Sequence, residues 1–130
     1  MKKSFIFLCL IGSMFMLPAQ EPSEALKETY YDAEFFFLEE FYQDALPEYL
    51  KIYKRGFEDN ANLNYKIGIC YLNIPGEKEK SIPYFQKAAQ DVTTRYNEGV
   101  FRETKAPLDV YLFLGNAYRV TNQLDKAIQS

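Results

Sequence analysis

The chain contains few residues that could do chemistry. Its 130 residues include no histidine, the side chain that most often serves as a general base or a transition-metal ligand. Acidic residues gather at positions 39–40 and 77–80, where carboxylates could pair or bind an ion, but both places are predicted helix ends or turns, where charge is normally solvated. The sequence has no glycine-rich phosphate loop and no metal-ligand spacing. We therefore expect no catalytic site, cofactor or metal in these residues, and classify the chain as a non-enzyme.

Cysteine chemistry is equally limited. Cys9 lies in an apolar N-terminal run, so Cys70 is the only thiol once that run is removed. A single cysteine forms no intrachain disulfide. Cys70 falls on the apolar face of a predicted helix, and we interpret it as a small buried hydrophobic residue.

The N-terminus has the pattern of a secretory signal peptide. Two lysines precede an apolar run over residues 5–17, which is followed by a small-residue site at Ala19. These 13 residues are too few to span a bilayer, which requires about 20. We expect a signal peptide at residues 1–19, cleavage after Ala19, and no membrane span in the mature chain.

The mature chain is mildly acidic. Cleavage removes Lys2 and Lys3 and no acidic residue, which changes the net charge from -3 to -5. Binding to nucleic acid or anionic lipid depends on clustered Lys and Arg. We therefore expect no nucleic-acid partner.

Helical periodicity dominates the mature sequence. Apolar residues recur at intervals of three and four over residues 30–52, 63–72 and 110–118, which is the spacing of one helix face. Breaks at residues 56–60 and 75–76 separate the predicted helices, and Asn60 is placed to cap the helix that follows it. We place three prolines in or near first turns, where the missing N–H costs little: Pro47, Pro83 and Pro107. The pattern predicts an all-α fold.

Two segments of the sequence recur. Ala45-Leu46-Pro47-Glu48-Tyr49 is echoed by Ser81-Ile82-Pro83-Tyr84-Phe85, and Gly68-Ile69-Cys70-Tyr71 by Gly115-Asn116-Ala117-Tyr118. Such repetition indicates a solenoid, whose helical pairs bury their apolar faces by stacking and leave a long surface for a partner.

These landmarks resemble the tetratricopeptide repeat (TPR), a pair of antiparallel helices of about 34 residues. The family's small and large apolar positions match two groups of residues: Ile67, Gly68, Tyr71, Ser81, Phe85 and Ala88 in the second unit, and Tyr111, Leu114, Gly115, Tyr118 and Ala127 in the third. The resemblance implies a TPR solenoid of about two and a half repeats, over about residues 26–59, 60–93 and 107–130, the third truncated. The domain is then residues 20–130, and we expect it to be a fragment of a longer protein.

An insertion at residues 91–105 interrupts the repeats. The distance from Gly68 to Gly115 is 47 residues, well above one repeat. The insertion is mostly polar but contains Tyr96 and Phe101. We interpret it either as a solvated connector or as a loop that contacts a partner, since insertions in repeat proteins map to loops on one face.

A broader resemblance comes from the signal peptide together with four motifs: Tyr31-Asp32-Ala33-Glu34, Asn64-Tyr65-Lys66-Ile67-Gly68, Glu103-Thr104-Lys105-Ala106-Pro107-Leu108-Asp109 and Asn122-Gln123-Leu124-Asp125-Lys126-Ala127-Ile128. They are similar to the N-terminal repeats of bacterial envelope proteins that continue into a WD-repeat-like propeller and an OmpA-like domain. The resemblance implies an exported interaction scaffold in the periplasm or at the outer membrane of a Gram-negative bacterium, as part of an OmpA-like complex or a secretion- or gliding-associated complex. Any peptidoglycan contact would belong to a domain not present here. The alternative is the targeting arm of an envelope enzyme or transporter whose active domain lies beyond Ser130.

In repeats of this kind the first helix of each pair lines a concave groove that binds a protein or peptide. Transferring those positions gives the predicted partner-binding residues: Tyr30, Glu34, Phe37, Asn62, Tyr65, Ile69, Asn73, Asp109, Leu112, Asn116 and Arg119. Several of them are equally suited to packing between neighbouring repeats.

Overall fold

The computed structural model describes residues 24–129, and the predicted signal peptide lies outside them. The described chain is mostly helical, as the periodicity predicts. Its elements are α1 (Glu24–Leu38), α2 (Tyr42–Tyr53), α3 (Ala61–Asn73), the short 3₁₀ helix η1 (Lys78–Lys80), α4 (Ser81–Ala88), β1 (Val92–Thr93), β2 (Ala106–Pro107), α5 (Val110–Val120) and α6 (Leu124–Gln129).

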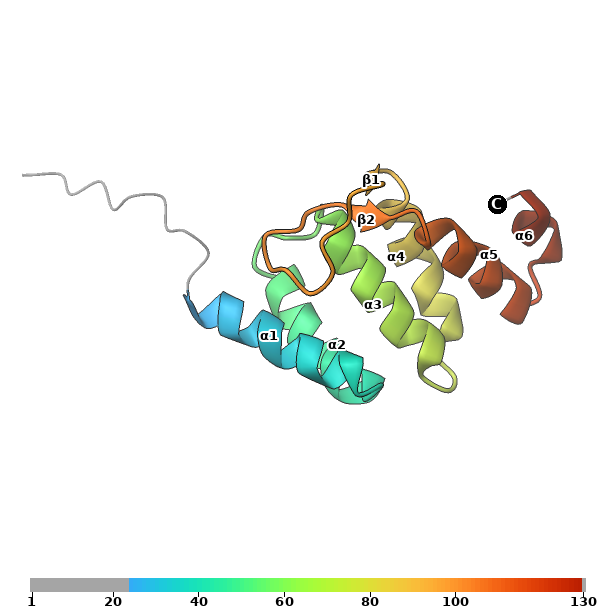
Figure 1. The fold of residues 1–130 in the computed structure, drawn as a ribbon. Coiled ribbons are helices and arrows are strands. Elements are labelled where there is room, and N and C mark those ends of the chain that lie inside the picture. Colours follow the sequence, from blue (N-terminus) through green and yellow to red (C-terminus); the bar gives the residue numbers. More distant parts are fainter. Residues whose placement is uncertain (1–23, 130) are drawn as a thin grey trace, which may run out of the picture.

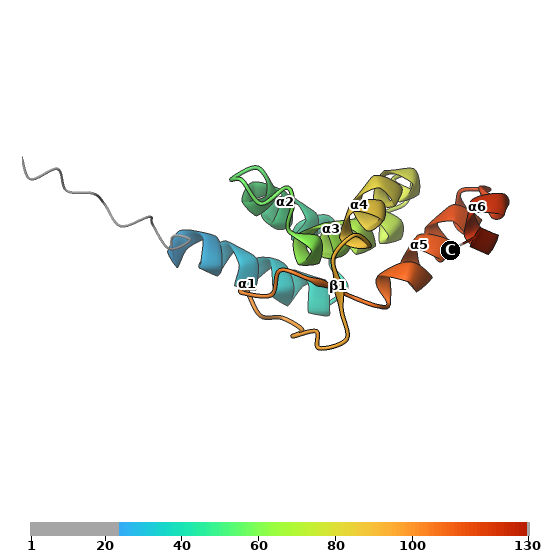
Figure 2. The same ribbon diagram turned by 90° about the horizontal axis from the view of Figure 1, so that it is seen from above.

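The helices form a row in which each α-helix packs against the next one along the chain (Figure 1). Seen from above, α2, α4 and α6 lie along one side of the row, and α1, α3 and α5 along the other (Figure 2). The segment around β1 and β2 lies on the side of α1, α3 and α5. Ten of the eleven residues predicted for the groove belong to α1, α3 and α5, and Asp109 directly precedes α5.

The helix ends follow local signals that the sequence contains. Asn60 caps α3, because its side chain accepts a hydrogen bond of 2.9 Å from the amide of Leu63. Gly56 and Gly76 have φ values of +97° and +80°, which glycine adopts at little cost, and they lie in the turns after α2 and α3. The predicted breaks at these turns are confirmed.

Two of the three proline predictions are wrong. Pro83 lies in the first turn of α4, as predicted. Pro47 is the sixth residue of α2, because that helix begins at Tyr42, where the amides of Asp44 and Ala45 bond the Phe41 carbonyl. Its side chain is exposed.

Pro107 lies in a strand instead of a helix. β1 and β2 pair in parallel, with Val92 opposite Ala106 and Thr93 opposite Pro107. The amide of Ala106 donates to the Asp91 carbonyl at 2.9 Å. The sequence did not predict these strands, since two residues are too few to show alternation.

Helix α3 is the centre of the molecule. All ten residues from 61 to 70 are buried, on every side of the helix, and two apolar clusters meet on it. The first joins α1, α2 and α3 through Tyr30, Ala33, Ala45, Tyr49, Ile52, Leu63, Ile67 and Cys70. The second joins α3, α4, β2 and α5 through Ala61, Tyr65, Ile69, Leu72, Ile82, Phe85, Ala88, Ala106, Val110, Ala117 and Tyr118.

Candidate interaction groove

The structure divides the eleven predicted groove residues into two groups. Those on α1 and α3 lie together and are largely covered: Tyr30, Glu34, Asn62, Tyr65 and Ile69 are buried, and Phe37 is half-buried. The others lie toward the end of α3 and on α5, where Asn73, Asp109, Leu112 and Arg119 are exposed and Asn116 is half-buried. One part of the predicted groove is therefore covered and the other is open.

The cover is the insertion itself. Residues 94–105, which we call the groove loop, leave β1, pass over α3 toward α1 and return to β2 (Figures 1 and 2). The loop was predicted to be a solvated connector or a partner-contacting loop. Most of its residues are exposed, as in a solvated connector, while its aromatic side chains and one carboxylate contact its own chain at the predicted groove.

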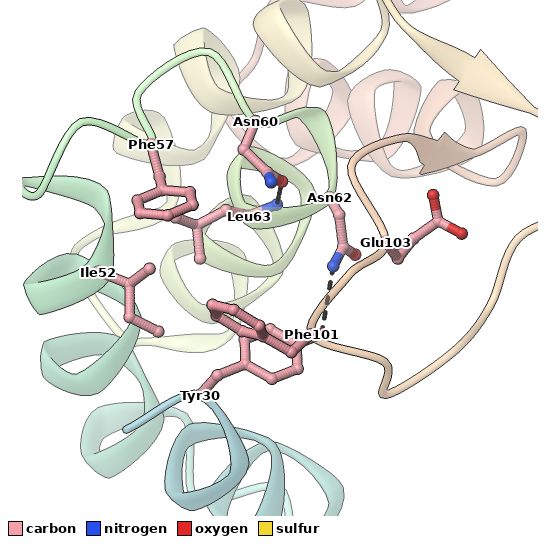
Figure 3. A pocket seen from close by; sticks show the side chains of 8 residues that line it. All are labelled: Tyr30, Ile52, Phe57, Asn60, Asn62, Leu63, Phe101 and Glu103. Atoms are coloured by element: carbon pink, nitrogen blue, oxygen red, sulfur yellow. Dashed lines mark hydrogen bonds between the residues drawn. The ribbon is translucent and has the colours of Figure 1, made fainter. Parts of the chain in front are cut away.

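Aromatic rings fix the far end of the loop. The Phe101 ring centroid lies 5.4 Å from that of Tyr30 and 6.4 Å from that of Phe57, within the range of favourable aromatic pairs. Figure 3 shows these rings beside Ile52 and Leu63. Nearer the start of the loop, the Tyr96 ring lies 6.1 Å from Tyr65 in an edge-to-face arrangement.

Asn62 connects α3 to both the loop and α1. Its amide nitrogen donates to the Tyr30 hydroxyl at 3.2 Å, and its amide oxygen accepts from the Tyr96 hydroxyl. The loop also supplies a backbone acceptor, because the Thr104 carbonyl accepts from the amides of Ala61 at 3.0 Å and Asn62 at 3.3 Å. These are the first two residues of α3, whose amides have no partner within the helix.

A buried lysine lies below the middle of the loop. Lys66 is completely buried, and its Nζ lies 3.3 Å from Oε2 of Glu34 and 4.2 Å from the centre of the Phe37 ring. Glu98 of the loop forms a second ion pair with it. A buried cation requires such compensation, since an unpaired charge in the interior is very costly.

The tyrosines around these charges have raised pKa values. The Tyr49 hydroxyl donates to Oε1 of Glu34. Burial, and next the charge of Glu34, raises the pKa of Tyr30 and Tyr49 far above the ordinary range. Burial and the charge of Glu98 do the same to the pKa of Tyr96.

The space beneath Phe101 is too small for a ligand. The cavity among Tyr30, Phe57 and Phe101 measures about 10 Å³ (Figure 3), which is about the space for one water molecule. Within residues 24–129 no cluster of acidic residues and cysteines is arranged to hold a metal ion. Over the same residues no helix combines the length and apolar character needed to cross a membrane.

The open part of the groove lies on α5. Leu112 is 74% exposed there, although leucine is normally buried. The Arg119 guanidinium donates to the Asn116 amide oxygen at 2.7 Å, so polar groups lie beside the exposed leucine.

Sequence reasoning missed the two charged residues that connect the loop to the groove, Lys66 and Glu98. One signal for Lys66 was present, because it is the only charged residue in the sequence of α3. Nothing comparable marks Glu98, which lies in a polar stretch and is 58% exposed at its side chain. An exposed apolar row on α1, formed by Tyr31, Phe35 and Leu38, was also not assigned.

No protein-family model, curated protein or solved structure matches this chain.

Proposed function

We propose that the chain is an exported, TPR-type scaffold of the bacterial cell envelope, which binds a protein partner along the side formed by α1, α3 and α5. In this proposal α1 with α2 and α3 with α4 are antiparallel helix pairs, and α5 with α6 begins a third. The chain binds and carries out no reaction.

The packing of Gly68 supports the assignment to this repeat family. A Cβ at that position would lie 2.7 Å from two ring atoms of Phe85 on α4, which is closer than side chains allow. A small residue where two paired helices touch is what the repeat requires.

The observation that carries the binding proposal is the groove loop. An irregular segment of the chain lies along α1 and α3. Its backbone bonds the first two amides of α3, and its aromatic rings and a carboxylate pair with groove side chains. A surface that holds such a segment has the donors, acceptors and apolar contacts needed for a peptide. The exposed face of α5 continues this surface and is open to a partner.

Site-specific photo-cross-linking in the bacterium that encodes the chain tests the proposal. A photoreactive residue replaces Leu112 in the open groove, and the matched control replaces Lys51, whose side chain is 62% exposed on α2. We expect a discrete cross-linked protein from position 112 and none from position 51. Equal cross-linking at both positions, or none at position 112, contradicts the proposal.

A further inference from the structure

The groove loop occupies the surface that the proposed function assigns to a partner. We propose that the loop is an internal ligand of the groove and that the partner binds by displacing it. The partner segment is then a peptide that turns as the loop does at Gly99, with an aromatic residue, a carboxylate two positions later and a second aromatic residue three positions after that. This inference rests on the proposed function, because it specifies the partner of the same groove.

The spacing comes from three contacts of the loop. Tyr96 binds beside Tyr65 and donates its hydroxyl to Asn62. Glu98 pairs with Lys66. Phe101 packs between Tyr30 and Phe57. The three side chains contact three separate places on the groove. A peptide that binds there must therefore present an aromatic ring, a carboxylate and a second aromatic ring in this order.

The carboxylate is the most selective of the three groups. One side of the Lys66 ammonium is occupied by Glu34, which is itself bonded to Tyr49. Glu98 approaches from the solvent side, since its own side chain is mostly exposed. A partner's carboxylate can therefore replace that of Glu98 without rearrangement of the core, whereas a neutral side chain would leave Lys66 with one partner fewer.

Contacts within the loop allow it to move away from the groove as one unit. Its two ends are held together by β1 and β2, and the Glu103 carboxylate accepts from the amides of Asn97 and Lys105, both at 2.9 Å. The shape of the loop is thus kept by contacts within it and at its neck. Most of its residues are exposed, which is typical of segments that open locally.

The first test asks whether the groove binds the loop sequence as a separate peptide. In one variant of the chain, residues 95–103 are replaced by a Gly/Ser segment of equal length, which keeps β1 and β2. Thr104 is also kept, because its carbonyl bonds the first amides of α3 while the loop is closed, although it moves away with the loop when the loop opens. The probe is a synthetic, fluorescently labelled peptide of residues 94–103. Its affinity for the variant and for the wild-type chain is measured by fluorescence anisotropy.

We expect the peptide to bind the loop-replaced variant at least about tenfold more tightly than the wild type, because the attached loop competes at an effective concentration of order mM. Peptides carrying Glu98→Gln or Phe101→Ala should each bind at least about tenfold more weakly, since each loses one of the groups that the groove pairs. A folded variant that binds none of the peptides, or all of them equally, overturns the inference.

The second test uses the wild-type chain and does not depend on how the variant folds. The amides of Ala61 and Asn62 bond only the loop carbonyl of Thr104, whereas the amide of Leu63 bonds the Asn60 side chain. Native-state hydrogen exchange should therefore be faster at Ala61 and Asn62 than at Leu63 if the loop opens while α3 remains intact. Exchange of all three amides only upon global unfolding overturns the inference.

The two proposals fail in different ways. The peptide and exchange experiments require nothing outside the chain, so they can succeed where cross-linking from position 112 fails. Cross-linking at position 112 with no peptide binding would leave the scaffold function standing and remove the displacement of the loop.

Discussion

The ammonium group of Lys66 on α3 lies 3.3 Å from the carboxylate of Glu34 on α1, and both side chains are buried. The pair joins two residues that are 32 positions apart in the sequence and belong to different helices. Buried ion pairs are weak contributors to stability as a whole, but they are very sensitive to the loss of one member. We infer that this pair specifies how α1 lies against α3, beneath the groove loop.

Removing only the cation should destabilise the protein strongly. Lys66→Met keeps most of the side-chain volume but leaves the buried Glu34 carboxylate without its cation. We expect the free energy of unfolding to fall by about 3–5 kcal/mol, measured by urea denaturation monitored by circular dichroism.

An exposed lysine provides the matched control. Lys51 pairs with Glu48 at 2.6 Å, but its side chain is 62% exposed, and Lys51→Met should cost less than about 1 kcal/mol. Adding Glu34→Gln to Lys66→Met should restore part of the loss, because the uncompensated charge disappears. Equal losses in the two lysine variants would show that Lys66 is not held in a buried pair.

The local features of the fold were predictable because short-range signals encode them. The periodicity of residues 63–72 and the cap at Asn60 placed α3, and the apolar setting of Cys70 predicted its burial, which the structure confirms. Pro47 shows the limit, since nothing local indicates that α2 begins five residues before it.

Some of the predicted partner-binding residues lie together in the structure, but their burial was not predicted. Tyr30, Glu34 and Asn62 come together on one surface. Their burial depends on the groove loop, whose contacts join residues more than 30 positions apart, such as Asn62 with Tyr96. The periodicity of apolar residues gives no information about contacts between distant residues, and the polar sequence of the loop alone indicates a solvated connector.

A methyl group at Gly68 should be too large for its site. The added Cβ would lie 2.7 Å from the Phe85 ring, and overpacking of this kind costs about 1–3 kcal/mol. The better helix propensity of alanine offsets up to about 1 kcal/mol of this, so Gly68→Ala should be less stable than the wild type in thermal denaturation. In the Phe85→Leu background the same substitution should cost less, because the ring is absent. Additive losses would contradict the contact.

The Asn60 cap should contribute measurably to the start of α3. Asn60→Ala removes the oxygen that accepts from the Leu63 amide at 2.9 Å, and we expect a loss of about 1 kcal/mol. For a domain of this size this corresponds to a fall in Tm of about 4–8 °C. Asn60→Asp keeps the acceptor and should remain close to the wild type. An equally large fall for both variants would assign the effect to something other than the cap.

The Cys70 thiol should make stability depend on pH in the alkaline range. Burial raises its pKa from the ordinary value of 9.0 to about 12, so the unfolded state loses the proton at a lower pH than the folded state. The contribution of the thiol to the free energy of unfolding is complete below about pH 9 and is lost as the pH rises toward 12.

The variant Cys70→Ala lacks this group but keeps the tyrosines, so the effects of tyrosine titration cancel when the two proteins are compared. The stability difference between wild type and Cys70→Ala should narrow above pH 9 by up to about 1.4 kcal/mol per pH unit, measured by urea denaturation between pH 7 and 11. A difference that stays constant across this range would mean that the thiol ionises at the same pH in both states and is not buried in the folded chain.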